Sequence, residues 1–272
     1  MGDYKVIAIE KKGHVAWLWL NNPDKLNVMG KPFWTDFPLA VRELADDPEV
    51  WVVVVAAKGR AFSAGLDLKT MGGSIGMDGA EGMLGGRDKL LKEIMHLQEA
   101  FTLIEESPKP FIAAVHGFCI GGGLDLMAVC DIRLASADAV ISLREARMAI
   151  VADLGSLQRL PAIIGQGQLR ELAFTGKDID AARAKEIRLL NEVYPDQNAL
   201  YAAADKLANE IAGNSPLVVQ GIKRILNFGE GKSVKDALQF VATWNSSFLL
   251  SEDLMEAFQA FAQKRPPEFK GR

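Results

Sequence analysis

Two continuous apolar runs constrain the fold more than any other feature of this 272-residue sequence. Residues 50–57 read Val-Trp-Val-Val-Val-Val-Ala-Ala, and residues 111–115 read Phe-Ile-Ala-Ala-Val. Short runs of this kind, rich in β-branched residues and without alternating polar positions, are typical of strands buried on both faces. Such strands occur in sheets that helices cover on both sides. The pattern therefore predicts an α/β fold with right-handed crossovers.

Other strand and helix patterns surround these two runs. Alternating apolar residues predict an N-terminal hairpin, and helical spacing predicts two helices before the second run. The glycine-rich segment at residues 71–86 is interpreted as a mobile surface loop, with a lid over a ligand as the alternative. The expected strands are Tyr4–Glu10, His14–Leu20, Asp131–Ala135, Val140–Ser142 and Glu192–Tyr194, and the early helices are Lys31–Asp47 and 87–107.

From Ser156 onward the sequence is mostly helical. No compositional linker interrupts it, so a separate folding unit is not expected there. We predict a core at residues 1–200 and a C-terminal helical region at residues 201–272 that serves assembly. The expected helices are Leu157–Ile164, Gly167–Thr175, Ala181–Glu186, Leu200–Ile211, Leu217–Asn227, Ser233–Asn245 and Glu252–Gln263.

Composition and charge exclude several classes of partner. The formal net charge of −4 argues against nucleic acid and against an anionic membrane as the main partner. No run approaches the roughly 20 apolar residues of a membrane helix. Cys119 and Cys130 match no metal or redox spacing, and no metal site is expected. The ends of the chain show neither a leader nor a peroxisomal signal, which leads us to expect a cytoplasmic protein.

Gly121-Gly122-Gly123 lies where the second apolar run passes into a helix. Glycines at such a turn let a ligand approach backbone N–H groups at the positive end of a helix dipole. The turn can hold a phosphate or a developing oxyanion, and Gly65-Leu66 offers a second donor from another strand end. Close packing of helix against strand explains the glycines equally well, and the local sequence does not decide between the two.

Three carboxylates follow the glycine turn, and each has a structural explanation. Asp125 can interact with the N-terminus of its own helix, Glu145 can pair with a neighbouring arginine, and Asp153 can cap the next helix. Asp153 also follows the apolar residues 148–152. A carboxyl group against an apolar wall has a raised pKa and can carry a proton near neutral pH.

Five motifs extend over nearly the whole chain: Asn22-Pro with Leu26-Asn27, Arg60-Ala-Phe-Ser-Ala-Gly-Leu-Asp-Leu68, His116-Gly with Gly121–Gly123 through Cys130-Asp-Ile-Arg133, Gln158-Arg-Leu-Pro161, and Ser251-Glu-Asp through Lys264-Arg-Pro-Pro267. Together they resemble the crotonase (enoyl-CoA hydratase/isomerase) superfamily. The resemblance implies a spiral of ββα units with a C-terminal helical trimerisation region, giving a homotrimer or a dimer of trimers. It implies acyl-CoA thioesters as substrates, with no cofactor besides the coenzyme A of the substrate.

The resemblance also assigns roles to individual residues. It implies that the N–H groups of Leu66 and Gly122 form an oxyanion hole. Other positions that match coenzyme A contacts are Ala64 and Leu68, together with Phe261 and Lys264 from a neighbouring subunit.

Departures from the hydratase pattern favour one reaction. Hydratases carry a glutamate where this chain has Asp125, and a glycine where it has Asp153. An aspartate at that second position, together with Glu145, resembles the Δ3,5-Δ2,4-dienoyl-CoA isomerases. That reaction needs acid–base groups at C2 and C6, and we expect Asp153 at C2 and Glu145 at C6, an order that the sequence leaves open. The alternatives are an enoyl-CoA hydratase, a Δ3-Δ2-enoyl-CoA isomerase and a non-catalytic acyl-CoA-binding protein.

Overall fold

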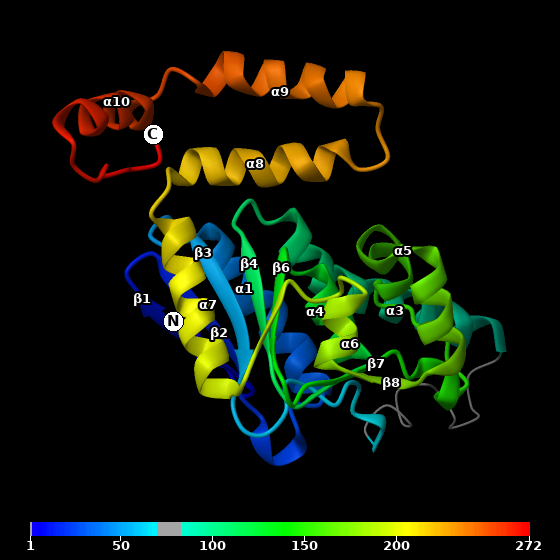
Figure 1. Ribbon diagram of the computed structural model, residues 1–272. Helices are drawn as coiled ribbons and strands as arrows, with labels where there is room; N and C mark the ends of the chain where they lie inside the picture. Colours follow the sequence, from blue (N-terminus) through cyan, green and yellow to red (C-terminus); the bar gives the residue numbers. More distant parts are fainter. Residues whose placement is uncertain (1, 70–82) are drawn as a thin grey trace.

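The computed structural model describes residues 2–69 and 83–272 (Figure 1). The segment predicted as a glycine-rich surface loop, residues 71–86, lies mostly outside this part of the chain. Its last four residues belong to helix α3 (Met83–Glu106), which therefore begins four residues earlier than expected.

The main sheet runs in the order β1-β2-β3-β4-β6-β9. The hairpin β1–β2 is antiparallel, and every later pairing in this sheet is parallel. The α/β prediction is confirmed, and the two apolar runs form β3 and β4 at the centre of the sheet. The strands are β1 (Ile7–Lys12), β2 (Val15–Leu20), β3 (Val52–Ala57), β4 (Phe111–Val115), β6 (Ile132–Ser136) and β9 (Glu192–Tyr194).

Helices cover both faces of this sheet, which explains why its central strands are apolar throughout. Val52 and Val54 face helix α7 (Gln197–Ala212), whereas Val53 and Val55 belong to the larger core beneath α1 (Lys31–Asp46), α3 and α4 (Gly122–Val129). Successive strand residues point to opposite faces, so a strand with helices on both sides needs an apolar residue at every position.

A second, small sheet has the order β5-β7-β8, with strands Phe118–Ile120, Val140–Ser142 and Asp178–Asp180. The sequence predicted only the middle strand. Phe118–Ile120 stands between two glycines, and Asp178–Asp180 has a single apolar residue between two aspartates, so neither resembles a strand. Helix α5 (Ser156–Thr175) contains Gly165 with a φ of +76°, which separates the two helices expected there. The remaining elements of the core are α6 (Ala181–Glu186), η1 (Pro23–Lys25) and η2 (Glu145–Met148).

Helices α8 (Pro216–Gly229), α9 (Val234–Phe248) and α10 (Glu252–Gln263) lie beyond the core in one projecting layer (Figure 1). Each begins at a serine whose side chain accepts a hydrogen bond from the first turn, which fixes the starting residue. Large apolar side chains remain exposed here, among them Leu226, Leu250, Phe258 and Phe261. The boundary predicted at residue 200 falls within α7, which packs on the sheet.

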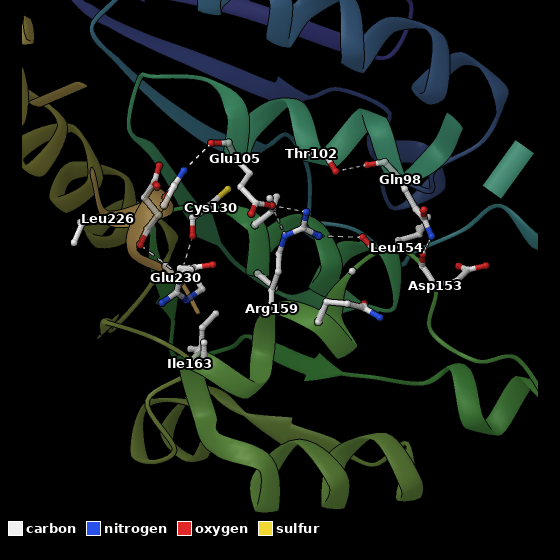
Figure 2. Close-up of a pocket in the computed structure, with 18 residues that line it drawn as sticks. Gln98, Thr102, Glu105, Cys130, Asp153, Leu154, Arg159, Ile163, Leu226 and Glu230 are labelled. Carbon is white, nitrogen blue, oxygen red and sulfur yellow. Dashed lines mark hydrogen bonds and ion pairs between the residues drawn. The ribbon is translucent and has the colours of Figure 1, made fainter. Parts of the chain in front are cut away.

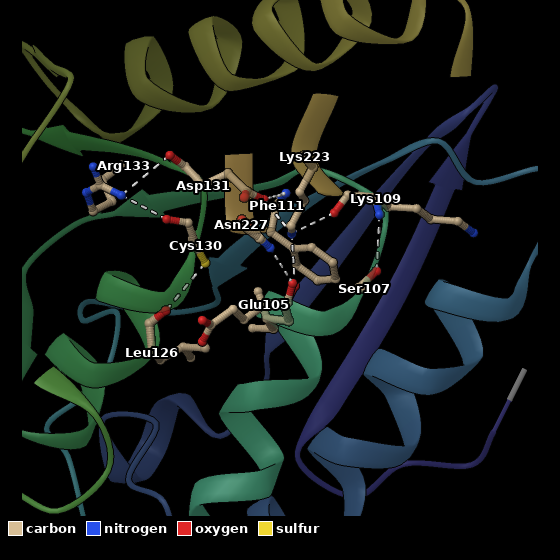
Figure 3. Close-up of polar contacts among 11 residues, drawn as sticks. Glu105, Ser107, Lys109, Phe111, Leu126, Cys130, Asp131, Arg133, Lys223 and Asn227 are labelled. Atoms are coloured by element: carbon tan, nitrogen blue, oxygen red, sulfur yellow. Dashed lines mark hydrogen bonds and ion pairs between the residues drawn. The ribbon is translucent and has the colours of Figure 1, made fainter. Parts of the chain in front are cut away.

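Lys223 fixes α8 to the core (Figure 3). Its ammonium group is buried and donates to the carbonyl oxygens of Ile104 and Lys109, at 2.9 and 3.0 Å, and to the Asp131 carboxylate, at 2.8 Å. The same Asp131 oxygen accepts a hydrogen bond from the backbone N–H of Phe111. One lysine therefore joins the end of α3, the start of β4 and the turn before β6.

Candidate active site

The chain segments that follow β3 and β4 lie side by side at the carboxyl ends of these strands. Ser63 N–H donates to the Phe118 carbonyl at 2.8 Å, and Ile120 N–H donates back to the Ser63 carbonyl at 3.0 Å. Ligands bind in α/β sheets at this end, where loops from neighbouring strands meet. The pairing brings the Gly65–Leu66 turn next to the glycine turn that opens α4.

Asn27 and Ser63 hold the Gly65–Leu66 turn in place. The Asn27 side chain donates to the carbonyl oxygens of Lys58 and Ala61, at 2.9 and 2.8 Å. Ser63 Oγ donates to the Asn27 carbonyl and accepts from Gly65 N–H. The motif that contains Asn27 therefore builds the loop after β3, with no part in the reaction required to explain it.

Two backbone N–H groups lie where these two turns meet, and neither has a hydrogen-bond acceptor among the described residues. Neither Leu66 N–H nor Gly122 N–H donates to an acceptor in residues 2–69 or 83–272. Gly122 lies in the first turn of α4, where N–H groups have no acceptor in the helix. A Cβ built on Gly65 would lie only 3.5 Å from Gly122 N. The two predicted oxyanion donors are thus on adjoining segments, and an anionic oxygen could accept from both.

Packing also requires glycines at this turn, so the two interpretations of Gly121–Gly123 do not exclude one another. Gly121 has a φ of +52°, a conformation that favours glycine. A Cβ on Gly122 would lie 2.9 Å from the Met29 sulfur, and one on Gly123 would lie 3.0 Å from the Ser63 carbonyl oxygen. The N–H groups of Leu66 and Gly122 have no acceptor among the described residues even in this close packing.

Glu145 points into the molecule at the start of η2. Its Oε2 is buried and has no hydrogen-bond partner among the described residues, and its Oε1 would lie 3.0 Å from a Cβ on Gly121. The expected ion pair with a neighbouring arginine is wrong, because Arg144 pairs with Asp178 and Arg147 bonds to the Thr175 carbonyl. Burial, and then the charges of Asp125 and Asp153, raise the pKa of Glu145 to about 7.

Asp125 caps a helix, but a different helix from the one that contains it. Its carboxylate is almost fully buried and accepts a 2.7 Å hydrogen bond from the backbone N–H of Ser156, in the first turn of α5. The N-cap position of α5 is Gly155, which has no side chain for this task. Burial raises the pKa of Asp125 to about 6, although hydrogen bonding from Ser156 favours the ionised form.

Asp153 is half-buried just before α5. It does not cap this helix, so the structural explanation offered by the sequence is wrong. Burial raises the pKa of Asp153, in the direction that the apolar surroundings predict. The adjacent residues Ala152 and Leu154 are buried, whereas Ile150 and Val151 are exposed.

The three carboxyl groups form one electrostatic cluster. Besides burial, the charge of Asp153 raises the pKa of Asp125, and both aspartates raise the pKa of Glu145. Like charges that meet in a poorly solvated site favour a mixture of protonated and ionised groups near neutral pH. Such a cluster beside two free N–H donors can move protons on a substrate whose carbonyl oxygen becomes negative.

The predicted coenzyme A contacts lie in two distant places. Ala64 and Leu68 flank Leu66 on the loop after β3, and the Leu68 side chain is half-exposed. Phe261 and Lys264 are exposed at the end of α10, in the projecting layer (Figure 1). Within one protomer these two pairs do not meet. Phe261 and Lys264 would contribute to a site only in a neighbouring subunit.

A cavity of about 800 Å³ lies behind Asp153, between α3, α5 and the end of α8 (Figure 2). Its walls mix polar side chains, such as Gln98, Thr102, Glu105 and Arg159, with apolar ones, such as Val129, Ile163 and Leu226. Of the predicted site residues, only Asp153 reaches this cavity. The free N–H donors and the other two carboxylates lie elsewhere, so the cavity is not the place where the predicted chemistry converges.

Other candidate groups have structural roles. His116 is buried and bonds to the Gly59 carbonyl at 2.9 Å and to Tyr201 at 3.2 Å, and these contacts join the loop after β3 to helix α7. The described residues contain no cluster of His, Cys, Asp and Glu side chains that could hold a metal ion. None of the described helices combines the length and apolar character that spanning a membrane requires.

Sequence reasoning missed two residues that hold the Asp153 loop. Gln98 on α3 donates to the Asp153 carbonyl at 2.7 Å, and Arg159 on α5 pairs with Glu105 at 2.6 Å. Arg159 belongs to the Gln158-Arg-Leu-Pro161 motif, but the sequence assigns no function to its side chain. Gln98 carries no sequence signal, since a glutamine on a helix is ordinarily a surface residue.

The family model for enoyl-CoA hydratase/isomerase matches residues 10–272 of the chain. A peroxisomal Δ3,5-Δ2,4-dienoyl-CoA isomerase from Arabidopsis thaliana is 41% identical over 274 residues, covering 99% of this chain and 98% of the relative. A mitochondrial protein of the same name from Dictyostelium discoideum is 42% identical, covering 98% and 92%. The solved structure of an enoyl-CoA hydratase from Bacillus anthracis is 29% identical with a TM-score of 0.89, covering 98% of this chain and all of that chain.

These names overturn one expectation. The cytoplasmic location predicted from the sequence is wrong, because the relatives at 41% and 42% identity are named peroxisomal and mitochondrial. The prediction depended only on the absence of a recognised targeting signal from the sequence. Such an absence does not determine a compartment, because targeting signals are not part of the folded core.

The extent of these matches decides the family and confirms the fold that the motifs implied. The family model covers nearly the whole chain, and the relatives align from end to end at well above 30% identity. The chain belongs to the enoyl-CoA hydratase/isomerase family, the crotonase superfamily of enzymes.

Proposed function

We propose that this enzyme isomerises 3,5-dienoyl-CoA to 2,4-dienoyl-CoA in fatty acid oxidation. The observation that carries the proposal is the carboxyl cluster: Asp153 interacts with Asp125 and Glu145, beside the free N–H groups of Leu66 and Gly122. The relatives named Δ3,5-Δ2,4-dienoyl-CoA isomerase support the same reaction.

The two N–H groups would bind the thioester oxygen. Removal of a C2 proton leaves a negative charge that spreads from this oxygen to C6 through the two double bonds. Hydrogen bonds from Leu66 and Gly122 strengthen as the charge develops, and each such donor lowers the barrier by about 3 kcal/mol. Because both are backbone groups on packed segments, they need no reorientation during the reaction.

Two carboxyl groups would carry the protons. Asp153, ionised, takes the C2 proton, and Glu145, protonated, gives a proton to C6, so that both double bonds move one carbon toward the carbonyl. The pKa of Glu145, raised by burial to about 7, supplies a protonated acid near neutral pH. After each turnover Asp153 holds a proton that Glu145 has lost, and exchange with solvent restores the starting state.

Hydration of a 2-enoyl-CoA is the second candidate, since a solved relative is named an enoyl-CoA hydratase. That reaction would require Asp125 and Glu145 to activate a water molecule. Asp125 is almost fully buried, and one of its oxygens accepts from Ser156 N–H, so it is poorly placed to bind water. This burial favours isomerisation and leaves Asp125 with the task of raising the pKa of Glu145.

We further propose that the chain assembles as a homotrimer or a dimer of trimers through residues 201–272. The exposed apolar side chains of α8–α10, such as Leu226, Leu250 and Phe258, are unusual for a surface that faces only water. Assembly would bring Phe261 and Lys264 of one subunit to the coenzyme A site of another, near Ala64 and Leu68. No cofactor is needed besides the coenzyme A of the substrate.

Two substrates test the reaction. With 3,5-octadienoyl-CoA an isomerase increases the ultraviolet absorbance, because the product is conjugated with the carbonyl. With crotonyl-CoA a hydratase decreases it, because the conjugated double bond is lost. We expect the first change to be much faster. A fast decrease with crotonyl-CoA and none with the dienoyl substrate would show a hydratase, and no change with either would contradict both reactions.

Asp153→Asn tests the assignment of the base. The amide cannot accept the C2 proton, so we expect the isomerisation rate to fall at least 100-fold, as for the loss of a general base. Asp24→Asn, on an exposed turn, is the matched control and leaves the rate unchanged. Full isomerase activity in the Asp153 variant would refute the assignment.

A further inference from the structure

The loop that carries Asp153 has few bonds of its own. The N–H groups of residues 151–155 donate no hydrogen bond to a backbone carbonyl of the described chain. A loop of this kind moves readily unless side chains fix it. A catalytic carboxylate displaced by about 1 Å loses up to 100-fold in rate, so this loop needs an external support.

Gln98 supplies one support from α3. Its side-chain amide donates to the backbone carbonyl of Asp153 at 2.7 Å, and both residues line the cavity behind the site (Figure 2). The bond reaches the backbone of Asp153, so it restrains the residue while leaving its carboxylate free.

Arg159 supplies the second support, from the first turn of α5. Its Nε and Nη2 both bind Glu105 Oε2, at 2.9 and 2.6 Å, which fixes the guanidinium against α3. Its Nη1 then faces the Leu154 carbonyl at 3.4 Å. A Cβ on Gly155 would lie only 1.8 Å from this Nη1, so the guanidinium lies directly on the Gly155 backbone.

Both supports depend on helix α3. Gln98 lies on α3, and Glu105, two turns along the same helix, orients Arg159 (Figure 2). The carbonyl of Asp153 and that of the next residue, Leu154, are therefore each held by a side-chain donor. This arrangement fixes the two successive peptide groups that follow Asp153, so the main chain on the C-terminal side of the proposed base is held at two points.

We propose that Gln98 and Arg159 are positioning residues for Asp153, forming a two-point clamp on residues 153–155. The inference rests on the proposed function, since it assigns the clamp to the base of the isomerisation. Neither side chain touches the substrate. Their loss therefore changes the rate of the chemical step and leaves substrate binding nearly intact.

The first experiment measures kcat and KM for 3,5-octadienoyl-CoA in Gln98→Met and Arg159→Met. Each replacement keeps a long side chain but removes the donor. We expect kcat to fall at least 10-fold in each, with KM within about threefold of the wild type. Gln158→Met and Arg170→Met are the matched controls, because both side chains are exposed on α5. Unchanged kcat in both clamp variants would overturn the proposal.

A double variant separates positioning from general damage. If Gln98 acts through Asp153, adding Gln98→Met to Asp153→Asn produces no further loss of rate. A loss that multiplies with that of Asp153→Asn would instead show an independent structural effect, and the proposal would fall. Arg159→Lys retains a charge beside Glu105, but its single nitrogen cannot also reach the Leu154 carbonyl as Nη1 does. We expect this variant to keep the stability of the wild type with the low kcat of Arg159→Met.

Amide hydrogen exchange tests the clamp without using activity. Loss of the Gln98 donor should speed exchange in the first turn of α5, Ser156–Arg159, where N–H groups are bonded to Asp125 and Gly155. If the wild type does not isomerise the dienoyl substrate, the proposed function fails, and exchange still decides the clamp. Faster exchange confined to this turn supports it, and unchanged exchange overturns it.

Discussion

The carboxylate of Asp125, on helix α4, caps the first turn of α5 by accepting a 2.7 Å hydrogen bond from the backbone N–H of Ser156. The bond joins the helix that begins at the glycine turn to the helix that follows Asp153. A residue one turn from the proposed oxyanion hole therefore also fixes the end of the loop that carries the proposed base. The relationship gives Asp125 a structural task as well as an electrostatic one.

Asp125→Ala should lower the free energy of unfolding by about 1–3 kcal/mol, because Ser156 N–H loses its buried acceptor. Asp125→Asn keeps an acceptor oxygen and should cost less. It also removes the penalty of ionising a carboxyl whose pKa burial raises to about 6. Urea unfolding at pH 8 and one fixed protein concentration compares the variants. Equal losses for Ala and Asn would contradict the capping role.

The rate of isomerisation should depend on pH in a bell shape. Asp153 must be ionised, so the rate rises with pH on the acid side. Glu145 must be protonated, and its pKa is about 7, so kcat/KM should fall above that pH. The pH profile of kcat/KM from pH 5 to 9 checks this. The alkaline decrease should be absent from the low residual rate of Glu145→Gln, and its persistence there would assign it to another group.

Glu145→Gln should stabilise the protein at pH 8. The folded pKa of about 7 lies above the ordinary value of 4.5, so the folded state binds more protons, and stability decreases as pH rises between these values. Above pH 7 the wild type carries the full cost of ionisation, which we expect to be about 1–2 kcal/mol after solvent screening. Thermal unfolding at pH 4 and pH 8 measures the difference, which should vanish at pH 4.

Lys223→Met should destabilise the protein by about 3 kcal/mol, because it leaves Asp131 and two carbonyl oxygens without their buried donor. Since Lys223 fixes α8 to the core, we also expect a weaker assembly in sedimentation experiments. Lys92→Met, at an exposed position of α3 outside the proposed assembly region, is the control and should change neither stability nor assembly. An unchanged unfolding midpoint for Lys223→Met would show that the buried contacts contribute little.

Much of the fold was predictable because the responsible signals are local. The central strands β3 and β4 are apolar at every position, and the C-terminal helices begin at serines that cap them. Strands β5 and β8 were missed because Phe118–Ile120 lies between two glycines and Asp178–Asp180 carries an aspartate at each end. Their formation depends on the neighbouring strand β7, which contacts both.

The chemistry of the three carboxylates was only partly predictable. Residue type and motif spacing identified Asp125, Glu145 and Asp153 as candidate acid–base groups. Whether each has a structural role instead depends on its hydrogen-bond and ion-pair partners, which the sequence does not show. Arg144, a neighbour that could have paired with Glu145, pairs instead with Asp178, which lies 34 residues away in sequence. A carboxyl pKa depends on burial and on charges from other segments, and neither quantity can be read from local sequence.

The sequence by itself determined the layered α/β core, the family and the identity of the groups that could carry protons, since these depend on periodicity and on motif strings. Only the tertiary structure decided which helix Asp125 caps, which side chains hold the Asp153 loop and where each carboxylate points. The physical reason is distance: Gln98 and Asp153 are separated by 55 residues, and Asp125 and Ser156 by 31, so their hydrogen bonds exist only when the chain is folded.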